Sequence, residues 1–195
     1  MSNKKKTGLF FGSFNPLHVG HLIIANFFAE NTGLDEVWFI ISPHNPLKNK
    51  ASLLDERKRY YMVQIAVEDN PRLKASNIEF HLEQPSYTIH TLAVLNEKYP
   101  ANDFVLIMGS DNLESLHKWK NYEEILSQYQ IYVYNRPGKK ETRFDNHPSV
   151  KFFDAPLMQI SSSYIRNQIK QGKSVEYLLT PKVFDYVSSI HAYEK

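Results

Sequence analysis

The stretch LFFGSFNPLHVGH, residues 9–21, combines a strand, a tight turn and the start of a helix. Its first part, Leu9 to Phe11, is apolar and predicts a buried strand that stops at Gly12. Residues 13–16 (SFNP) are typical of a turn, because Asn-Pro interrupts regular structure. Apolar residues then recur with helical spacing, so the sequence predicts a helix that opens near His18.

The start of this predicted helix is suited to binding an anion. Amides in a first helical turn have no partner inside the helix, and the helix dipole adds partial positive charge there. Gly12 allows close backbone approach, and Gly20 leaves a notch without a side chain. His18 and His21 project from one helical face and can both donate to phosphate oxygens. We therefore predict a phosphate site here.

Two plainer interpretations of the histidines compete with this one. A His-x-x-His pair could be half of a zinc site, although catalytic zinc needs a third ligand and the sequence has no cysteine and no obvious histidine partner. The pair could also consist of ordinary surface residues, which is the usual interpretation of an isolated H-x-x-H. The missing third ligand disfavours the zinc site, and the full string from residue 12 to residue 21 disfavours the surface interpretation.

Length and composition restrict the class of protein. A chain of 195 residues, 42% hydrophobic and 13% aromatic, should form a single domain, 1–195, with residues 155–195 as a C-terminal helical portion. A net charge of +2 gives no reason to expect nucleic acid or a membrane as a partner. The lysines at 4–6 predict a solvated tail. The absence of cysteine and of any long apolar run favours a soluble, cytoplasmic protein, and a homodimer stays open.

Strand and helix patterns alternate almost throughout the chain. Residues 37–41 are apolar on both faces, as in an interior parallel strand covered by helices on both sides. Further strands are predicted within 73–80 and at 103–108, 130–134 and 150–153, and helices at 54–69, from a cap at Ser86, through 125–126, through 160–169 and from Thr180. The alternation predicts an α/β, Rossmann-like doubly wound fold, with a mostly parallel sheet and flanking helices.

Ligands of such folds bind beyond the carboxyl ends of the strands. Lys48 follows the strand at 37–41 and is a candidate phosphate ligand, although a lone loop lysine is more often only solvated. Gly109 and Asp111 follow the strand at 103–108. The Asp111 carboxylate could accept hydrogen bonds from ribose hydroxyls, cap the next helix, or do both.

A second helix start also carries groups that bind phosphate. Hydroxyls at 161–163 precede the helical run, and Arg166 lies one turn inward, where its guanidinium could bind phosphate bidentately. Between the two candidate sites, residues 136–148 form the longest polar connector and predict a surface loop.

The string GSFNPLHVGH (12–21) resembles the H-x-G-H signature of the nucleotidyltransferase superfamily, whose members join a nucleotide to a phosphate and release pyrophosphate. Together with ISSSYIR (160–166), it is similar to the two signatures of nicotinate or nicotinamide mononucleotide adenylyltransferases. PSYT (85–88), MGSD (108–111) and Trp119 resemble, in order and spacing, the bacterial nicotinate-nucleotide adenylyltransferases. The resemblance covers nearly the whole chain.

The resemblance implies a role for each matching residue. His18, His21 and Arg166 would be catalytic. The residues implied to bind ATP are Gly12, Ser13, Phe14, His18, Gly20, His21, Gly109, Asp111, Ser162, Ser163 and Arg166. The residues implied to bind nicotinate mononucleotide are Lys48, Thr88 and Trp119. Mg²⁺ would be the cofactor, carried by the phosphates of ATP rather than by protein ligands.

The acceptor side of the resemblance is more specific and also contains a departure. Trp119 would stack on the pyridine ring, and backbone amides near Thr88 and just after Trp119 would receive the nicotinate carboxylate. The family has Pro-Pro-His-Lys where this chain has Asn45-Pro46-Leu47-Lys48. Leu47 replaces the family's histidine, which leaves any phosphate contact of that histidine in doubt.

The implied reaction is in-line attack of the mononucleotide 5′-phosphate on the α-phosphate of ATP. A phosphate nucleophile is already ionised, so no strong general base is expected. Two alternatives remain. One is another H-x-G-H nucleotidyltransferase that takes phosphopantetheine or flavin mononucleotide as acceptor, and the other is a nucleotide-binding sensor without turnover.

Overall fold

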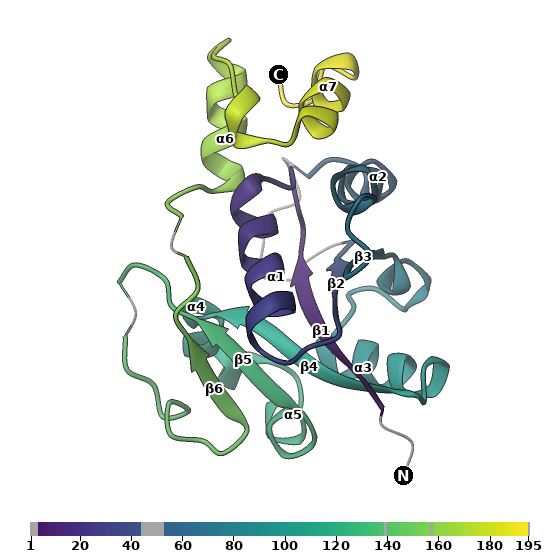
Figure 1. The fold of residues 1–195 in the computed structure, drawn as a ribbon, viewed down its shortest axis with the longest axis vertical. Coiled ribbons are helices and arrows are strands. Elements are labelled where there is room, and N and C mark those ends of the chain that lie inside the picture. Colours follow the sequence, from purple (N-terminus) through teal and green to yellow (C-terminus); the bar gives the residue numbers. More distant parts are fainter. Residues whose placement is uncertain (1–3, 44–52, 139, 157, 195) are drawn as a thin grey trace.

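The computed structural model describes residues 4–43, 53–138, 140–156 and 158–194 and contains one six-stranded sheet (Figure 1). All neighbouring strands are parallel, and their order is β3-β2-β1-β4-β5-β6. The strands are β1 (Lys5–Gly12), β2 (Glu36–Ile41), β3 (Leu73–Ser76), β4 (Asn102–Gly109), β5 (Gln130–Tyr134) and β6 (Val150–Phe153). This strand order confirms the predicted Rossmann-like doubly wound fold.

Helices cover both faces of the sheet. The α-helices are α1 (Val19–Asn31), α2 (Glu56–Val67), α3 (Thr88–Lys98), α4 (Ser110–Ser115), α5 (Tyr122–Gln128), α6 (Ser162–Lys170) and α7 (Pro181–Ser189). Short 3₁₀ turns are η2 (Ile78–His81), η3 (Leu116–Lys118) and η4 (Glu176–Leu178). No helix in the described ranges is long and apolar enough to cross a membrane.

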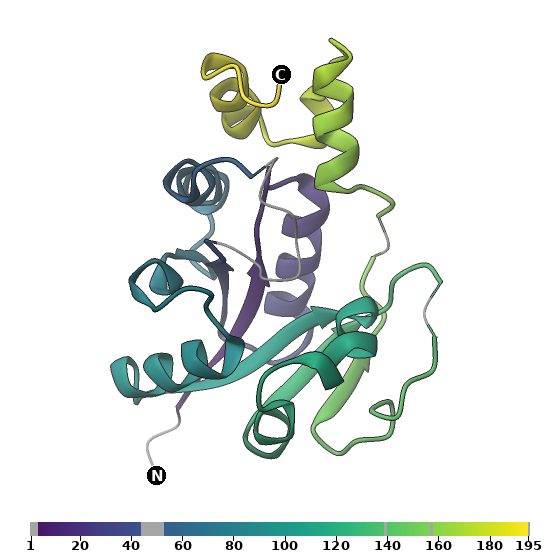
Figure 2. The ribbon, with the colours of Figure 1, turned by 180° about the vertical axis from the view of Figure 1, so that it is seen from behind.

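Alternation along the strands divides the core into two layers. Leu9 of β1 packs with α3, α4 and α5 on one face, whereas Phe10 packs with α1 and α2 on the other. Figures 1 and 2 show these two helical layers from opposite sides. β2 is buried along its whole length, as its continuous apolar run predicted.

The helices α6 and α7 lie at one end of the molecule and share a third core with α2 (Figure 1). Met62 of α2 packs there against Ile165 of α6 and Val183 of α7. This cluster holds the start of α6 close to the turn after β1, which matters for the site below. The expected division into one domain with a C-terminal portion from residue 155 stays a prediction.

Two local expectations are wrong. Lys5 and Lys6 belong to β1 rather than to a solvated tail, because the Lys5 ammonium pairs with Glu36 at 2.8 Å and the Lys6 ammonium donates to the Tyr132 hydroxyl at 2.9 Å. Ser86 does not cap α3, whose N-cap is Tyr87. The Ser86 hydroxyl donates instead to the buried Glu79 carboxylate at 3.0 Å.

Candidate active site

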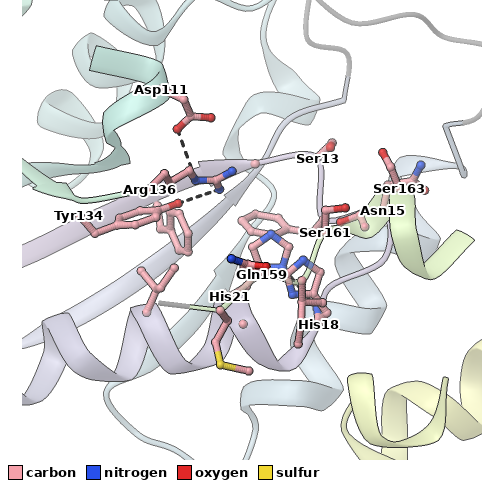
Figure 3. A pocket seen from close by; sticks show the side chains of 18 of the residues that line it. Ser13, Asn15, His18, His21, Asp111, Tyr134, Arg136, Gln159, Ser161 and Ser163 are labelled. Carbon is pink, nitrogen blue, oxygen red and sulfur yellow. Dashed lines mark hydrogen bonds and ion pairs between the residues drawn. The ribbon is translucent and has the colours of Figure 1, made fainter. Parts of the chain in front are cut away.

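The sheet forms a crevice where its winding reverses. β1 and β4 lie side by side, but the helices that follow them, α1 and α4, pack on opposite faces. Ligands of doubly wound folds bind at such a point, beyond the carboxyl ends of the strands. A cavity of about 850 Å³ lies there, lined by the turn after β1, the end of β5 and the start of α6 (Figure 3).

Most of the residues implied to bind ATP line this one cavity. They are Gly12, Ser13, Phe14, His18, Gly20, His21, Asp111, Ser162, Ser163 and Arg166. Gly109 lies directly beside it, because a Cβ at that position would be 2.5 Å from Asp111 Oδ1. Thus segments separated by about 150 positions in the chain meet at a single site. Lys48 and Leu47 lie outside the described residues.

The two histidines stack on each other at the start of α1. His18 is the N-cap residue, and the ring centroids of His18 and His21 are 3.7 Å apart. His21 Nδ1 accepts a hydrogen bond from the His18 backbone N–H at 3.3 Å, and the His21 ring packs edge-on against Phe10 and Phe14. These contacts fix the orientation of the pair before any ligand arrives.

His18 is buried in an unusual electrostatic state. Its side chain is 5% exposed, and among the described residues its Nδ1 has no hydrogen-bond partner. Burial, together with the positive charge of Arg136, lowers the pKa of His18 from 6.5 to about 4, so the imidazole is neutral at pH 7. A buried polar atom without a partner costs about 1–3 kcal/mol, and a ligand oxygen could remove that cost.

The turn after β1 requires a glycine at its start. A Cβ on Gly12 would lie 2.7 Å from the ring of Phe14, which is folded beneath the turn. Phe14 itself has a φ of 45° and is 2% exposed, so this ring forms the floor of the turn and contributes to the cavity wall. The Asn15-Pro16 peptide is cis.

Arg59 holds the turn from behind. Its guanidinium is fully buried and donates to the carbonyls of Ser13 (2.6 Å), Ser42 (2.8 Å), Pro43 (2.9 Å) and Leu54 (2.8 Å). These carbonyls belong to the turn after β1, the segment after β2 and the approach to α2. The planar guanidinium of arginine presents five donors in a fixed geometry and can bind several carbonyls at once. The compact ammonium of a lysine could not reach all four. No pattern in the sequence singles out this residue.

The start of α6 contacts the same turn from the other side. Ser161 caps α6 by accepting from the Tyr164 N–H at 3.1 Å, as the hydroxyl run predicted. The Ser162 hydroxyl donates to the Pro16 carbonyl at 2.9 Å, and Arg166 Nη1 donates to the Asn15 carbonyl at 2.8 Å. The first turn of α6 and the turn after β1 therefore form one wall of the cavity.

Arg136 is a site residue that the sequence analysis missed. It was assigned only to the polar connector, yet it lines the cavity with its Nε 3.4 Å from Asp111 Oδ1 and its Nη2 donating to the Tyr134 hydroxyl at 3.1 Å (Figure 3). Burial is the largest effect on Tyr134 and raises its pKa, so the phenol stays protonated. Its position in the sequence could have indicated this role, because Arg136 closely follows β5, and ligands bind beyond the carboxyl ends of the strands.

The residues expected on the acceptor side lie elsewhere. In the described part of the chain, Thr88 and Trp119 are not among the residues that line the 850 Å³ cavity. Thr88 begins α3, and Trp119 follows η3 and packs against the core on the same face of the sheet. Lys120 Nζ lies 4.7 Å from the centroid of the Tyr87 ring, which brings the two segments together.

Comparisons with known proteins agree with this architecture. A sequence model of the family described as cytidylyltransferase-like matches residues 9–168. Relatives from Flavobacterium psychrophilum and Flavobacterium johnsoniae, each named "Probable nicotinate-nucleotide adenylyltransferase", are 53% and 52% identical over 97% of this chain and 100% of their own lengths. The fold is similar to that of a Plasmodium falciparum nicotinic acid mononucleotide adenylyltransferase complexed with NaAD, with a TM-score of 0.82, 20% identity, and coverage of 97% of this chain and 98% of that one. The chain therefore belongs to the cytidylyltransferase-like family and, within it, to the nicotinate-nucleotide adenylyltransferases.

Proposed function

We propose that this protein transfers the adenylyl group of ATP to nicotinate mononucleotide, giving deamido-NAD and pyrophosphate in NAD biosynthesis. Identity above 50% over the full length of curated relatives supports the reaction. The structural observation that carries the proposal is the 850 Å³ cavity in the crevice between β1 and β4. The unpaired His18 Nδ1 and the starts of α1 and α6 meet there. Nothing in the described residues favours a phosphopantetheine or flavin acceptor, or a sensor.

The phosphate half of the site is proposed to include His18, His21, Ser162, Ser163 and Arg166. These residues surround the cavity from α1 and α6, whose first-turn amides add partial positive charge. Arg166 uses Nη1 on the Asn15 carbonyl and Nη2 on the Ser163 hydroxyl at 3.2 Å. A guanidinium carries five donors, so Arg166 can bind phosphate oxygens beside these two contacts.

The adenosine half is proposed to lie against Gly109 and Asp111. The Asp111 carboxylate is about half exposed and could accept from ribose hydroxyls while it stays next to Arg136. For the acceptor, we propose that Trp119 stacks on the pyridine ring and that amides near Thr88 and after Trp119 receive the carboxylate. The contact between Lys120 and Tyr87 supports this arrangement, because it brings those two segments together. Lys48 is proposed as a further phosphate ligand.

The chemistry requires positioning and charge neutralisation. An oxygen of the mononucleotide phosphate forms a bond to the α-phosphorus of ATP, while the bond from that phosphorus to the bridging oxygen breaks and its electron pair leaves with pyrophosphate. His18, His21 and Arg166 would donate to the oxygens on which charge accumulates. Since the nucleophile is already ionised, no residue needs to remove a proton.

Mg²⁺ is proposed to enter the site bound to the phosphates of ATP. In the described ranges, no group of three or more His, Cys, Asp or Glu side chains is arranged to hold a metal ion, and the donors around the cavity are chiefly cationic or neutral. Such a set suits a phosphate-bound metal better than a metal held by the protein. When bound, Mg²⁺ would neutralise part of the phosphate charge.

The test is pyrophosphate release from ATP and Mg²⁺ with nicotinate mononucleotide, beside nicotinamide mononucleotide and phosphopantetheine. We expect release with nicotinate mononucleotide to exceed release with the other two acceptors. His18→Ala and Arg166→Ala should each lower turnover far more than thermal stability. Release only with another acceptor would refute the proposed acceptor site, and tight ATP binding without release from any acceptor would favour a sensor.

A further inference from the structure

Tyr193 reaches the active-site turn from the segment after α7. Its hydroxyl donates to the side-chain oxygen of Asn15 at 2.7 Å, across 178 positions of sequence. Asn15 lines the cavity and is only 3% exposed. This hydrogen bond links the segment after α7 to the turn that carries the H-x-G-H string.

The backbone conformation after α7 places the Tyr193 hydroxyl next to Asn15. α7 ends at Ser189, and the backbone then reverses through left-handed residues, with φ of 48° at His191 and 68° at Tyr193. Left-handed conformations cost side-chain-bearing residues about 1–2 kcal/mol, so surrounding contacts must maintain them. Ala192, 4% exposed in the core shared by α2, α6 and α7, and its N–H bond to the Val187 carbonyl at 3.0 Å supply those contacts.

Asn15 is the point at which several elements hold the turn. Its side-chain oxygen also accepts from the Leu54 N–H at 3.2 Å, and its backbone carbonyl accepts from Arg166 at 2.8 Å. The Tyr193 bond therefore acts beside contacts on this residue from the segment before α2 and from α6. Asn15 lies in the turn between Ser13 and His18, and both of these residues line the cavity.

We infer that Tyr193 is a positioning residue for ATP, acting through Asn15. The inference rests on the proposed function, because it assumes that the turn binds the nucleotide phosphates. Tyr193 is not itself among the residues that line the cavity in the described part of the chain, so it acts only through the turn. Burial raises the pKa of the Tyr193 phenol, so the hydroxyl is protonated and able to donate at neutral pH.

The variant Tyr193→Phe separates this role from simple packing. It keeps the ring that packs in the core, removes only the hydroxyl, and leaves Asn15 with its contact from Leu54. Tyr177→Phe is the matched control, since Tyr177 is 88% exposed on η4 in the same part of the fold. Loss of one neutral hydrogen bond in a positioned turn should weaken ATP binding about fivefold.

The experiment measures KM for ATP, KM for nicotinate mononucleotide and kcat at 25 °C, with thermal melts of each variant. We expect Tyr193→Phe to raise the KM for ATP about fivefold and to change the KM for the acceptor less than twofold, while Tyr177→Phe matches the wild type. If Tyr193 acts through Asn15, adding Tyr193→Phe to Asn15→Ala should produce little further change.

Two results would overturn the inference. One is unchanged ATP kinetics in Tyr193→Phe, and the other is full additivity of the two substitutions, which would show that Tyr193 does not act through Asn15. If the wild type failed to turn over nicotinate mononucleotide, the proposed function would fail separately. Calorimetric titration of the wild type and Tyr193→Phe with ATP alone would then decide the inference, with equal affinities refuting it.

Discussion

The burial of a neutral His18 predicts how acid should destabilise the protein. In the unfolded chain this imidazole takes up a proton at its ordinary pKa of 6.5, whereas the folded protein holds it neutral down to about pH 4. As the pH falls below 6.5, the unfolded state therefore gains protons first. The contribution of His18 to stability is complete above pH 6.5 and is lost progressively as the pH falls toward 4.

The size of the stability loss follows from the difference between the pKa of His18 in the unfolded and folded states. A difference between 6.5 and about 4 corresponds to a total of ~3.4 kcal/mol, of which about 2 kcal/mol should be lost between pH 8 and pH 5. Since His18 is 5% exposed, solvent screening should reduce this value little. His18→Asn removes the titration, so the wild type should lose about 2 kcal/mol more than the variant over this range.

Urea unfolding at pH 8, 6 and 5, followed by circular dichroism, measures this difference. Other groups, including the buried Glu79, titrate in both proteins and cancel in the comparison. His117→Asn is a matched control, because His117 is exposed on η3 and its variant should follow the wild type. Parallel loss of stability in the wild type and His18→Asn would show that the buried imidazole is not held neutral.

Further predictions concern the turn, the metal and the bound anion. Gly20→Ala would place a Cβ 3.1 Å from His18 Nδ1, so KM for ATP should rise at least severalfold in steady-state kinetics, while the melting temperature changes little because alanine favours helix. Arg59→Met should lower the urea unfolding free energy by about 3–5 kcal/mol, since four partly buried carbonyls lose their donor at roughly 1 kcal/mol each; a loss below 1 kcal/mol would contradict this. EDTA should abolish pyrophosphate release without shifting the melting temperature, whereas a large shift would indicate a metal held by the protein. Bound pyrophosphate should raise the pKa of His18 measured by NMR, and an unchanged value would place the anion elsewhere.

The fold could be predicted because its signals are local. Gly12 and Asn15-Pro16 mark the turn, the run at 37–41 marks a strand buried on both faces, and Ser161 marks a helix start. Such patterns depend on the period of hydrophobic residues and on turn chemistry, both of which operate within a few residues. The alternation of elements then leaves few topologies.

The supports of the site could not be predicted in this way. Arg59 lies on a helix whose sequence places it among other charged residues, and its guanidinium donates to carbonyls of two distant segments, the turn after β1 and the segment after β2. Arg136 was predicted only as the first residue of a polar loop, and no pattern in the sequence singles out Tyr193. Each role exists only because the tertiary fold brings remote chain segments together. The predicted cap at Ser86 was wrong for a more local reason, because its hydroxyl donates to the buried carboxylate of Glu79, seven residues earlier.

The contact between Arg166 and Asn15 also has a consequence for biosynthesis. It joins positions 151 residues apart, so the turn is synthesised long before the side chain that completes its wall. At about 5–20 residues per second, a ribosome needs roughly 8–30 s to make the intervening chain. During that interval the nascent protein has its first strand, turn and helix without the residues of α6 that hold them. The wall that Arg166 forms with this turn is therefore completed only after α6 has been synthesised.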